Sequence, residues 1–206
     1  MSSRYRAHLV NSLSGFKSAN LIGTVSETGQ TNVAIFSSVV HLGASPALVG
    51  FIMRPENLER HTLENIKRTK QYTINQVSHS FWQSAHQTSA KYDGDTCEFD
   101  QTNLTKSFIE GIDAPFVKES KLKYSLLLKE IIPITANNTL FVIGEINNII
   151  CHDKAITQDG YIDIELLGTV AVSGLDSYHI SQRLSRLHYA QPAQLPLPIK
   201  NRPSTC

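Results

Sequence analysis

Polar side chains that could bind an anion gather in the first third of the sequence. They lie in and beside a predicted hairpin, and then at a turn and the start of a predicted helix: Asn32, Ser37, Ser38 and Ser45, followed by Arg54, Arg60, His61 and Thr62. Helix N-terminal amides, hydroxyl groups and a guanidinium supply hydrogen-bond donors and positive charge in one place, which suits a phosphomonoester. The residue types alone leave the alternative open that this cluster is an ordinary polar surface.

Other kinds of chemistry find little support in the sequence. There is no GxSxG, HExxH or GxxxxGK[ST] motif, and no GxGxxG follows a predicted strand. The 8 histidines are scattered without carboxylates at ligand spacing, so we expect no metal site. Cys97, Cys151 and Cys206 lack CxxC spacing, which argues against a disulfide framework and suits a reducing cytoplasm. Carboxylates such as Glu98 and Asp100 are interpreted as surface residues.

Composition narrows the class of protein and of partner. With 206 residues, 41% hydrophobic and 18% charged, the chain can form a sizeable core, which excludes general disorder. The net charge of +1 provides no field that would attract nucleic acid. No apolar run approaches the ~20 residues that span a bilayer, and the N terminus lacks a secretory signal. We therefore expect a cytoplasmic protein that binds neither nucleic acid nor membranes.

The polar cluster lies among short segments rich in β-branched residues, which predict the elements that hold it in place. We expect strands over residues 21–26, 31–36, 37–42, 47–53, 71–77, 121–134 and 139–151, and helices over 55–68, 78–90 and 177–189. Residues 91–119 are expected to be loops with short helical turns. These elements predict a mainly β fold, a closed antiparallel barrel with helical insertions, over residues 1–190. The Pro-rich residues 191–206 are expected to form an arm or a disordered tail.

Three finer predictions concern packing. Residues 121–134 alternate, with Leu122, Tyr124, Leu126 and Leu128 on a buried face and Lys123, Ser125 and Lys129 on a solvent face. Gly144 marks a bulge or a close approach within the following strand. Trp82, the only tryptophan, is expected to be buried against the barrel.

The order of residues around the polar cluster resembles a known family. The segments NVAIFSSVVHLGASPALVGFIM and RHTLENIKRTKQYTINQV are similar to the flavin reductase-like family, the FMN-binding split barrels that include flavoredoxins. The resemblance is carried by Asn32, Ala34, Ser37, Ser38, Ser45, Pro46, Arg60, Thr62, Asn65, Ile66 and Asn75. It extends over roughly residues 18–180, through the closing GLDSYH. This chain departs from many relatives in having His61 in place of an acidic residue and AVSGLDSY in place of an Arg with paired glycines.

The resemblance implies a six-stranded-type antiparallel split barrel that binds FMN non-covalently, commonly as a homodimer whose interface helps form the flavin pocket. Position by position, it assigns four residues to the flavin and its ribityl chain: Asn32, Phe36, Ser37 and Ser38. It assigns Arg54, Arg60 and Thr62 to the phosphate. Thr88, Ser89 and Ala90 would approach the flavin from a later helix, and Tyr178 would close the pocket. His61 is expected to contact the phosphate or to face water.

The resemblance also implies what the protein does. We expect an oxidoreductase in which bound FMN takes electrons from NADH or NADPH and passes them to free flavin or to an electron-acceptor protein. No catalytic side chain is predicted, because the flavin carries the chemistry. The alternative is a flavoredoxin-like electron carrier without nicotinamide turnover of its own.

Overall fold

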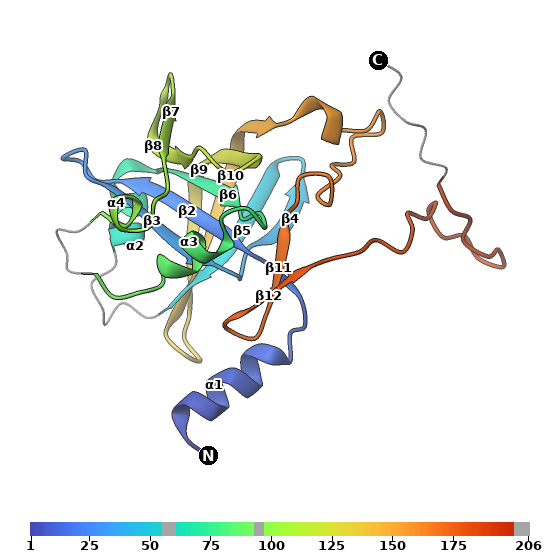
Figure 1. Ribbon diagram of the computed structural model, residues 1–206, viewed down its shortest axis with the longest axis horizontal. Coiled ribbons are helices and arrows are strands. Elements are labelled where there is room, and N and C mark those ends of the chain that lie inside the picture. Colours follow the sequence, from blue (N-terminus) through green and yellow to red (C-terminus); the bar gives the residue numbers. More distant parts are fainter. Residues whose placement is uncertain (55–60, 93–96, 200–206) are drawn as a thin grey trace.

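The computed structural model describes residues 1–54, 61–92 and 97–199, and these form a mainly antiparallel β structure with short helices (Figure 1). The helices are α1 Ser3–Ser12, α2 His61–Thr69, α3 Trp82–Gln87 and α4 Glu98–Gln101, with the 3-10 turn η1 at Asp153–Ala155. The strands are β1 Lys17–Ser18, β2 Asn20–Val25, β3 Thr31–Phe36, β4 Val40–Ala44, β5 Ala47–Met53, β6 Gln71–Gln76, β7 Lys106–Ile109, β8 Ile112–Val117, β9 Leu122–Ile134, β10 Thr139–Cys151, β11 Val170–Ser173 and β12 Ser177–Ile180. None of the described helices has the length and hydropathy needed to span a bilayer.

One seven-stranded sheet, in the order β3-β2-β6-β9-β10-β5-β4, forms the body of the molecule. All of its pairings are antiparallel, which confirms the predicted fold class, although the sheet has seven strands instead of six. Two small sheets accompany it, β1-β11-β12 and the hairpin β7-β8. The predicted hairpin β2–β3 and the long hairpin β9–β10 both form, and β10 has the predicted bounds.

Both faces of the sheet are covered along β2, so all six of its residues are buried. Ile22 packs into one hydrophobic cluster with Phe51, Tyr72 and the apolar face of α2. Leu21, its neighbour in sequence, points to the opposite face and joins a second cluster. Apolar side chains on both faces of β2 are therefore buried, and the neighbouring Leu21 and Ile22 belong to different clusters.

The second face of the sheet is covered by β8, which the sequence analysis assigned to loops. Thr73 on β6 donates a hydrogen bond of 2.6 Å to the Pro115 carbonyl, and Gly23 allows this approach because a Cβ there would lie 2.2 Å from the same oxygen. Lys123 lies beneath β8 and donates from Nζ to the Val117 carbonyl at 2.9 Å. The prediction that Lys123 and Ser125 face solvent is therefore wrong, because both side chains are buried under a strand that the local pattern did not reveal.

Gly144 fulfils its predicted role at the centre of β10. The register between β10 and β9 shifts between Ile143 and Gly144, as expected of a bulge. A Cβ at position 144 would also lie 2.2 Å from the Tyr72 hydroxyl, so only glycine lets Tyr72 pack there without a shift.

Two helix predictions need correction, and one helix was not predicted. The helix predicted over residues 78–90 is only the six-residue α3, and its Trp82 keeps 37% of its surface exposed instead of being buried. The helix predicted over 177–189 is wrong, because Ser177–Ile180 pairs with β11 as strand β12. The helix α1 was not predicted; it has no buried residue and stands apart from the sheet in Figure 1. The predicted helix entry at residues 55–60 lies outside the described residues.

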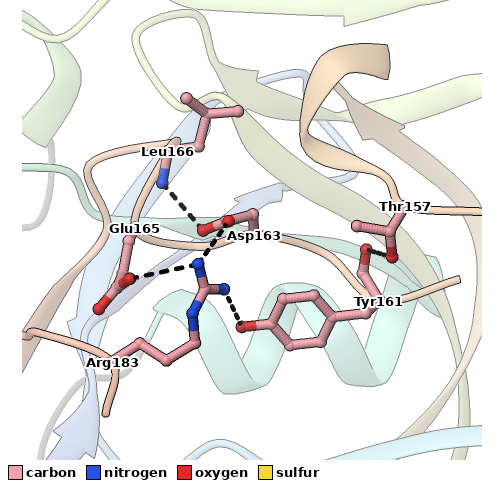
Figure 2. Close-up of polar contacts among 6 residues, drawn as sticks. All are labelled: Thr157, Tyr161, Asp163, Glu165, Leu166 and Arg183. Atoms are coloured by element: carbon pink, nitrogen blue, oxygen red, sulfur yellow. Dashed lines mark hydrogen bonds and ion pairs between the residues drawn. The ribbon is translucent and has the colours of Figure 1, made fainter. Parts of the chain in front are cut away.

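A C-terminal arm, residues 181–199, leaves the barrel as an irregular segment without a helix or a strand in its described part (Figure 1). Its base is fixed by Arg183, which lies 3.0 Å from the Asp163 carboxylate and 3.8 Å from Glu165 and donates a hydrogen bond of 3.2 Å to the Tyr161 hydroxyl (Figure 2). Arg186 adds a second anchor, with its guanidinium 4.1 Å from the centre of the Tyr161 ring. The arm exposes large apolar side chains both between these anchors, at Leu184, and beyond them, at Tyr189 and Leu195.

Candidate functional site

A pocket of about 810 Å³ opens beside strand β3, where the sheet ends. Its walls come from β3, the end of β5, the start of α2, the segment after α3, and α4. It brings together Asn32, Phe36, Ser37, Ser38, Arg54, His61, Thr62, Thr88, Ser89 and Ala90. These are the sequence-predicted site residues except Arg60 and Tyr178. Ser45, which the sequence analysis grouped with them, is exposed in the turn between β4 and β5 and does not line the pocket. Arg60 lies outside the described residues.

The pocket has an apolar wall that is held rigidly from behind. Ile35 and Phe36 at the end of β3 and Ile52 and Met53 of β5 contribute apolar surface to it. The Phe36 ring stands edge-on against Phe51, with ring centres 5.1 Å apart at 69°. Because Phe51 is fully buried, Phe36 has a fixed support behind it and is half-exposed toward the pocket.

Ser38 closes the corner of the pocket by tying the chain after β3 to strand β5. Its hydroxyl donates to the Ile52 carbonyl at 3.2 Å and accepts from the Ile52 amide at 3.0 Å. A hydroxyl has one proton to donate, so Ser38 has no second donor for a ligand in this arrangement. The structure thus gives Ser38 a positioning task at the pocket wall.

A buried polar chain links β3, α2 and α4. In the amide orientation that satisfies all neighbours, the Asn32 nitrogen donates to both Glu98 carboxylate oxygens at 3.2 and 3.3 Å, and the Asn32 oxygen accepts from the Thr62 hydroxyl at 2.9 Å. The Val33 amide, on the free edge of β3, also donates to Glu98 at 3.4 Å. Asn32 and Thr62 are both buried, so this chain fixes the start of α2 against the sheet.

Asn11, Lys91 and Tyr92 line the pocket although the sequence analysis did not predict them. Glu98 is the missed pocket residue that takes part in the buried polar chain. It was interpreted as a surface carboxylate, yet it lines the pocket and is half-buried. Burial raises its pKa above the ordinary value, while hydrogen bonds from backbone amides and the charge of His61 act in the opposite direction. No local motif marks this residue, because its position depends on α4 packing against β3, which is distant in sequence.

Positive charge lies along the open side of the pocket. Arg54 follows β5 and is exposed, His61 begins α2, and Lys91 follows α3. Among the described lining residues, Arg54 and Lys91 carry positive charge and Glu98 is the one carboxylate. The pocket therefore combines an apolar wall with a cationic rim, whereas the whole chain carries a net charge of only +1.

The segment after α3 forms the remaining wall, and Tyr178 supports it from behind. Thr88 and Ser89 donate their hydroxyls to the carbonyls of Ala85 and His86, at 2.8 and 2.7 Å, which ends the helix at the pocket. The Tyr178 hydroxyl lies 3.0 Å from His86 Nδ1. Burial raises the pKa of Tyr178 to about 12, so its hydroxyl stays protonated at neutral pH. Tyr178 does not itself line the pocket.

Trp82 also packs against the Tyr178 ring, with ring centres 5.2 Å apart.

Within the described residues, no group of three or more His, Cys, Asp or Glu side chains is arranged to hold a metal ion. The pocket instead fits a ligand with a planar apolar part and an anionic end. The apolar wall at Phe36 matches the first, and the hydroxyl and cationic groups at Ser37, Arg54 and His61 match the second.

Comparison with known proteins identifies the family. The sequence profile of the "Flavin reductase like domain" family matches residues 13–165. A crystal structure of a candidate flavin reductase with a split barrel domain from Shewanella frigidimarina is 54% identical, with a TM-score of 0.89 over 92% of this chain and 94% of that one.

More distant relatives share the fold or part of the sequence. Flavoredoxin of Desulfovibrio vulgaris is 20% identical, with a TM-score of 0.71 over 87% of this chain and 92% of that one, and shows the same fold. An uncharacterised Aquifex aeolicus protein is 25% identical over 70% of this chain and 74% of its own length. The profile match over most of the chain, the pocket beside β3 and the split-barrel sheet together show that this protein belongs to the flavin reductase-like family.

Proposed function

We propose that the protein is an FMN-binding oxidoreductase that takes electrons from NADH or NADPH. The observation that supports the proposal is the convergence of Asn32, residues 34–38, Arg54, residues 61–62 and residues 88–92 on one pocket with an apolar wall and a cationic rim. Family membership implies flavin binding, and the pocket volume of about 810 Å³ is large enough for a cofactor of this class. FMN, when bound, would supply the chemistry of accepting a hydride from a nicotinamide and releasing electrons to an acceptor.

The residues of this chain would then have binding and orienting tasks. Phe36 and Ile35 provide an apolar surface for the flavin ring, and Ser38 fixes the corner where the chain leaves β3. Arg54 and His61, beside the first turn of α2, would hold the phosphate. Thr88 and Ala90 would close the opposite side. None of these roles requires a side chain that transfers a proton.

The test is spectroscopic. Purified protein mixed with FMN is expected to show a shifted flavin absorbance band and quenched flavin fluorescence, and NADH or NADPH should bleach the band anaerobically. Protein that leaves the FMN spectrum unchanged at every concentration would refute the proposal. Riboflavin, which lacks the phosphate, is the matched ligand, and weaker binding of riboflavin than of FMN would place the phosphate at the cationic rim.

The electron acceptor divides the proposal into two forms. Steady-state oxidation of NADH or NADPH in the presence of excess FMN supports a reductase that passes electrons to free flavin. A bound flavin that is reduced once but does not turn over supports a flavoredoxin-like carrier that serves an acceptor protein. The fold resemblance to flavoredoxin of Desulfovibrio vulgaris is the observation that keeps this second form.

We also propose a cytoplasmic homodimer in which the exposed apolar segments are covered by a second copy. The C-terminal arm exposes Leu184 fully and Tyr189 almost fully, and α1 exposes Leu9 and Val10. Such surfaces, projecting from the barrel in Figure 1, are typical of segments that pack against another chain. Light scattering should give twice the chain mass for the full protein. A chain ending at residue 180 should dissociate, and an unchanged dimer would exclude the arm from the interface.

A further inference from the structure

Glu98 lines the same pocket as Arg54 and His61, the residues to which the proposed function assigns the phosphate. Its carboxylate is joined to the Thr62 hydroxyl through one side chain, Asn32, by hydrogen bonds of 3.2 and 2.9 Å. The carboxylate is also near enough to His61 for the charge of His61 to lower the pKa of Glu98. A phosphate held at His61 would therefore bring a second negative charge near Glu98, and like charges in a partly buried site repel each other. The site thus contains a negative group next to the position of a negative ligand.

The groups around Glu98 do not neutralise it by a direct ion pair. From β3, the neighbours are the Asn32 amide and the Val33 backbone amide, which are neutral donors. From α2, His61 favours the charged carboxylate. On the side of β7, Lys106 is occupied by Asp100 at 3.2 Å. Among the described residues, Glu98 has no salt-bridge partner that would cancel its charge when a phosphate enters.

We propose that Glu98 is a binding residue of this pocket and takes up a proton when a phosphorylated flavin enters. The neutral carboxyl removes the repulsion, keeps an oxygen to accept from Asn32, and gains an O–H that can donate to the ligand. The partial burial that already raises the pKa of Glu98 makes this protonation easier than at a surface carboxyl. The inference rests on the proposed function, because it requires a phosphate in this pocket.

The sign of the pH dependence follows from linkage. The pKa of Glu98 is higher in the complex with the phosphorylated ligand than in the free protein, so binding is tightest at low pH and weakens as the pH rises toward and through the pKa of the complex. Riboflavin has the same ring and ribityl chain without the phosphate. Its binding should show little of this dependence. Glu98 would in this way set how strongly the pocket prefers FMN over riboflavin at a given pH.

The experiment compares dissociation constants for FMN and riboflavin between pH 5.5 and 8.5 in the full-length protein and in E98Q. In the wild type, the FMN affinity relative to riboflavin should fall by about tenfold over this range, as expected of one pair of like charges in a partly buried site. E98Q should remove most of that fall and bind FMN about tenfold more tightly than the wild type at pH 8.5. D100N is the matched control on the same helix and should behave like the wild type.

Calorimetry in buffers of different ionisation enthalpy gives a second readout, because the wild type should take up a proton with FMN and E98Q should take up less. Equal pH slopes in the wild type and E98Q, or weaker FMN binding by E98Q at pH 8.5, would overturn the inference while the proposed function stands. A wild-type protein that binds no FMN at any pH would refute both. Retained riboflavin binding shows that E98Q has kept its fold; loss of riboflavin and FMN binding together would assign Glu98 a structural role and overturn the inference.

Discussion

The contact between Tyr72 and Gly144 allows a sharp test of the core that supports the pocket. Tyr72 is fully buried and packs edge-on against Phe51, which in turn supports Phe36 in the pocket wall. Its hydroxyl finds no hydrogen-bond partner among the described residues. The same hydroxyl occupies the space that a Cβ at Gly144 would need, at 2.2 Å. Replacing Tyr72 by Phe should therefore remove an unpaired polar atom and leave the ring packing intact.

The expected magnitude follows from these contacts. An unpaired buried hydroxyl lowers the free energy of unfolding by about 1–3 kcal/mol. Removing it leaves a small void, which reduces the gain in stability by only about a few tenths of a kcal/mol. Y72F should therefore raise the free energy of unfolding by about 1–2 kcal/mol, and Tm by about 2–6 °C at this chain length. G144A alone should lower stability by about 3 kcal/mol through overpacking. In the Y72F background the nearest remaining ring atom is Cζ, at 2.8 Å, so the same substitution should cost about 1–2 kcal/mol less.

Urea and thermal unfolding of the wild type, both single variants and the double variant provide the measurement. Y124F is the matched control, because Tyr124 on the neighbouring strand β9 is only half-buried and its hydroxyl is not among the buried polar atoms without a partner. Its stability should change by less than about 0.5 kcal/mol. A Y72F protein less stable than the wild type would show that the hydroxyl has a partner, and strict additivity of Y72F with G144A would refute the steric account of Gly144.

Three further predictions concern the pocket and the arm. S38A removes both contacts with Ile52 and should lower the free energy of unfolding by about 1–2 kcal/mol, measured by urea titration, and weaken FMN binding. Y178F frees His86 from its 3.0 Å contact, and should raise the FMN dissociation constant several-fold because the wall after α3 loses its support; an unchanged constant would contradict this. The pKa of Asp159 is lowered to about 2, chiefly by its hydrogen bond with Arg186, so this anchor contributes above the ordinary carboxyl pKa and is lost as the pH falls from about 4 toward 2. Hydrogen exchange at the Ile199 amide, which donates to the Arg186 carbonyl at 2.8 Å, should accelerate over that range in the wild type and be fast throughout in D159N.

The strands that bury their residues in a regular pattern were predictable from the sequence. Thr31–Phe36, Ala47–Met53 and Thr139–Cys151 occur with their predicted bounds, because β-branched runs between turn residues report local geometry. The errors lie where a distant segment changes the environment. The alternation along β9 places Lys123 on the face opposite to Leu122, but β8 covers that face. The Lys123 Nζ therefore donates to two backbone carbonyls instead of to water.

Residue types pointed to the polar part of the pocket, and only the resemblance assigned its residues position by position. Asn32 and Thr62 are 30 positions apart, and only the fold places them in one hydrogen-bonded chain. Their roles toward a flavin stay a prediction, while their common location in one pocket is a structural fact. Glu98 had neither a motif nor a periodic pattern to mark it. Its importance follows from a contact between α4 and β3 that no single segment encodes.

The position of the pocket follows from the topology of the sheet. Strand β3 is an edge strand, paired only with β2, so the backbone groups along its other side would be open to pairing with a further strand. Glu98 accepts from one of them, the Val33 amide, and the pocket occupies the space beside Ala34, Ile35 and Phe36. In the proposed function a bound flavin would cover this edge as a neighbouring strand would. The same opening of the sheet that exposes β3 thus creates the site, and α2 and α4 supply the polar groups that a strand would not.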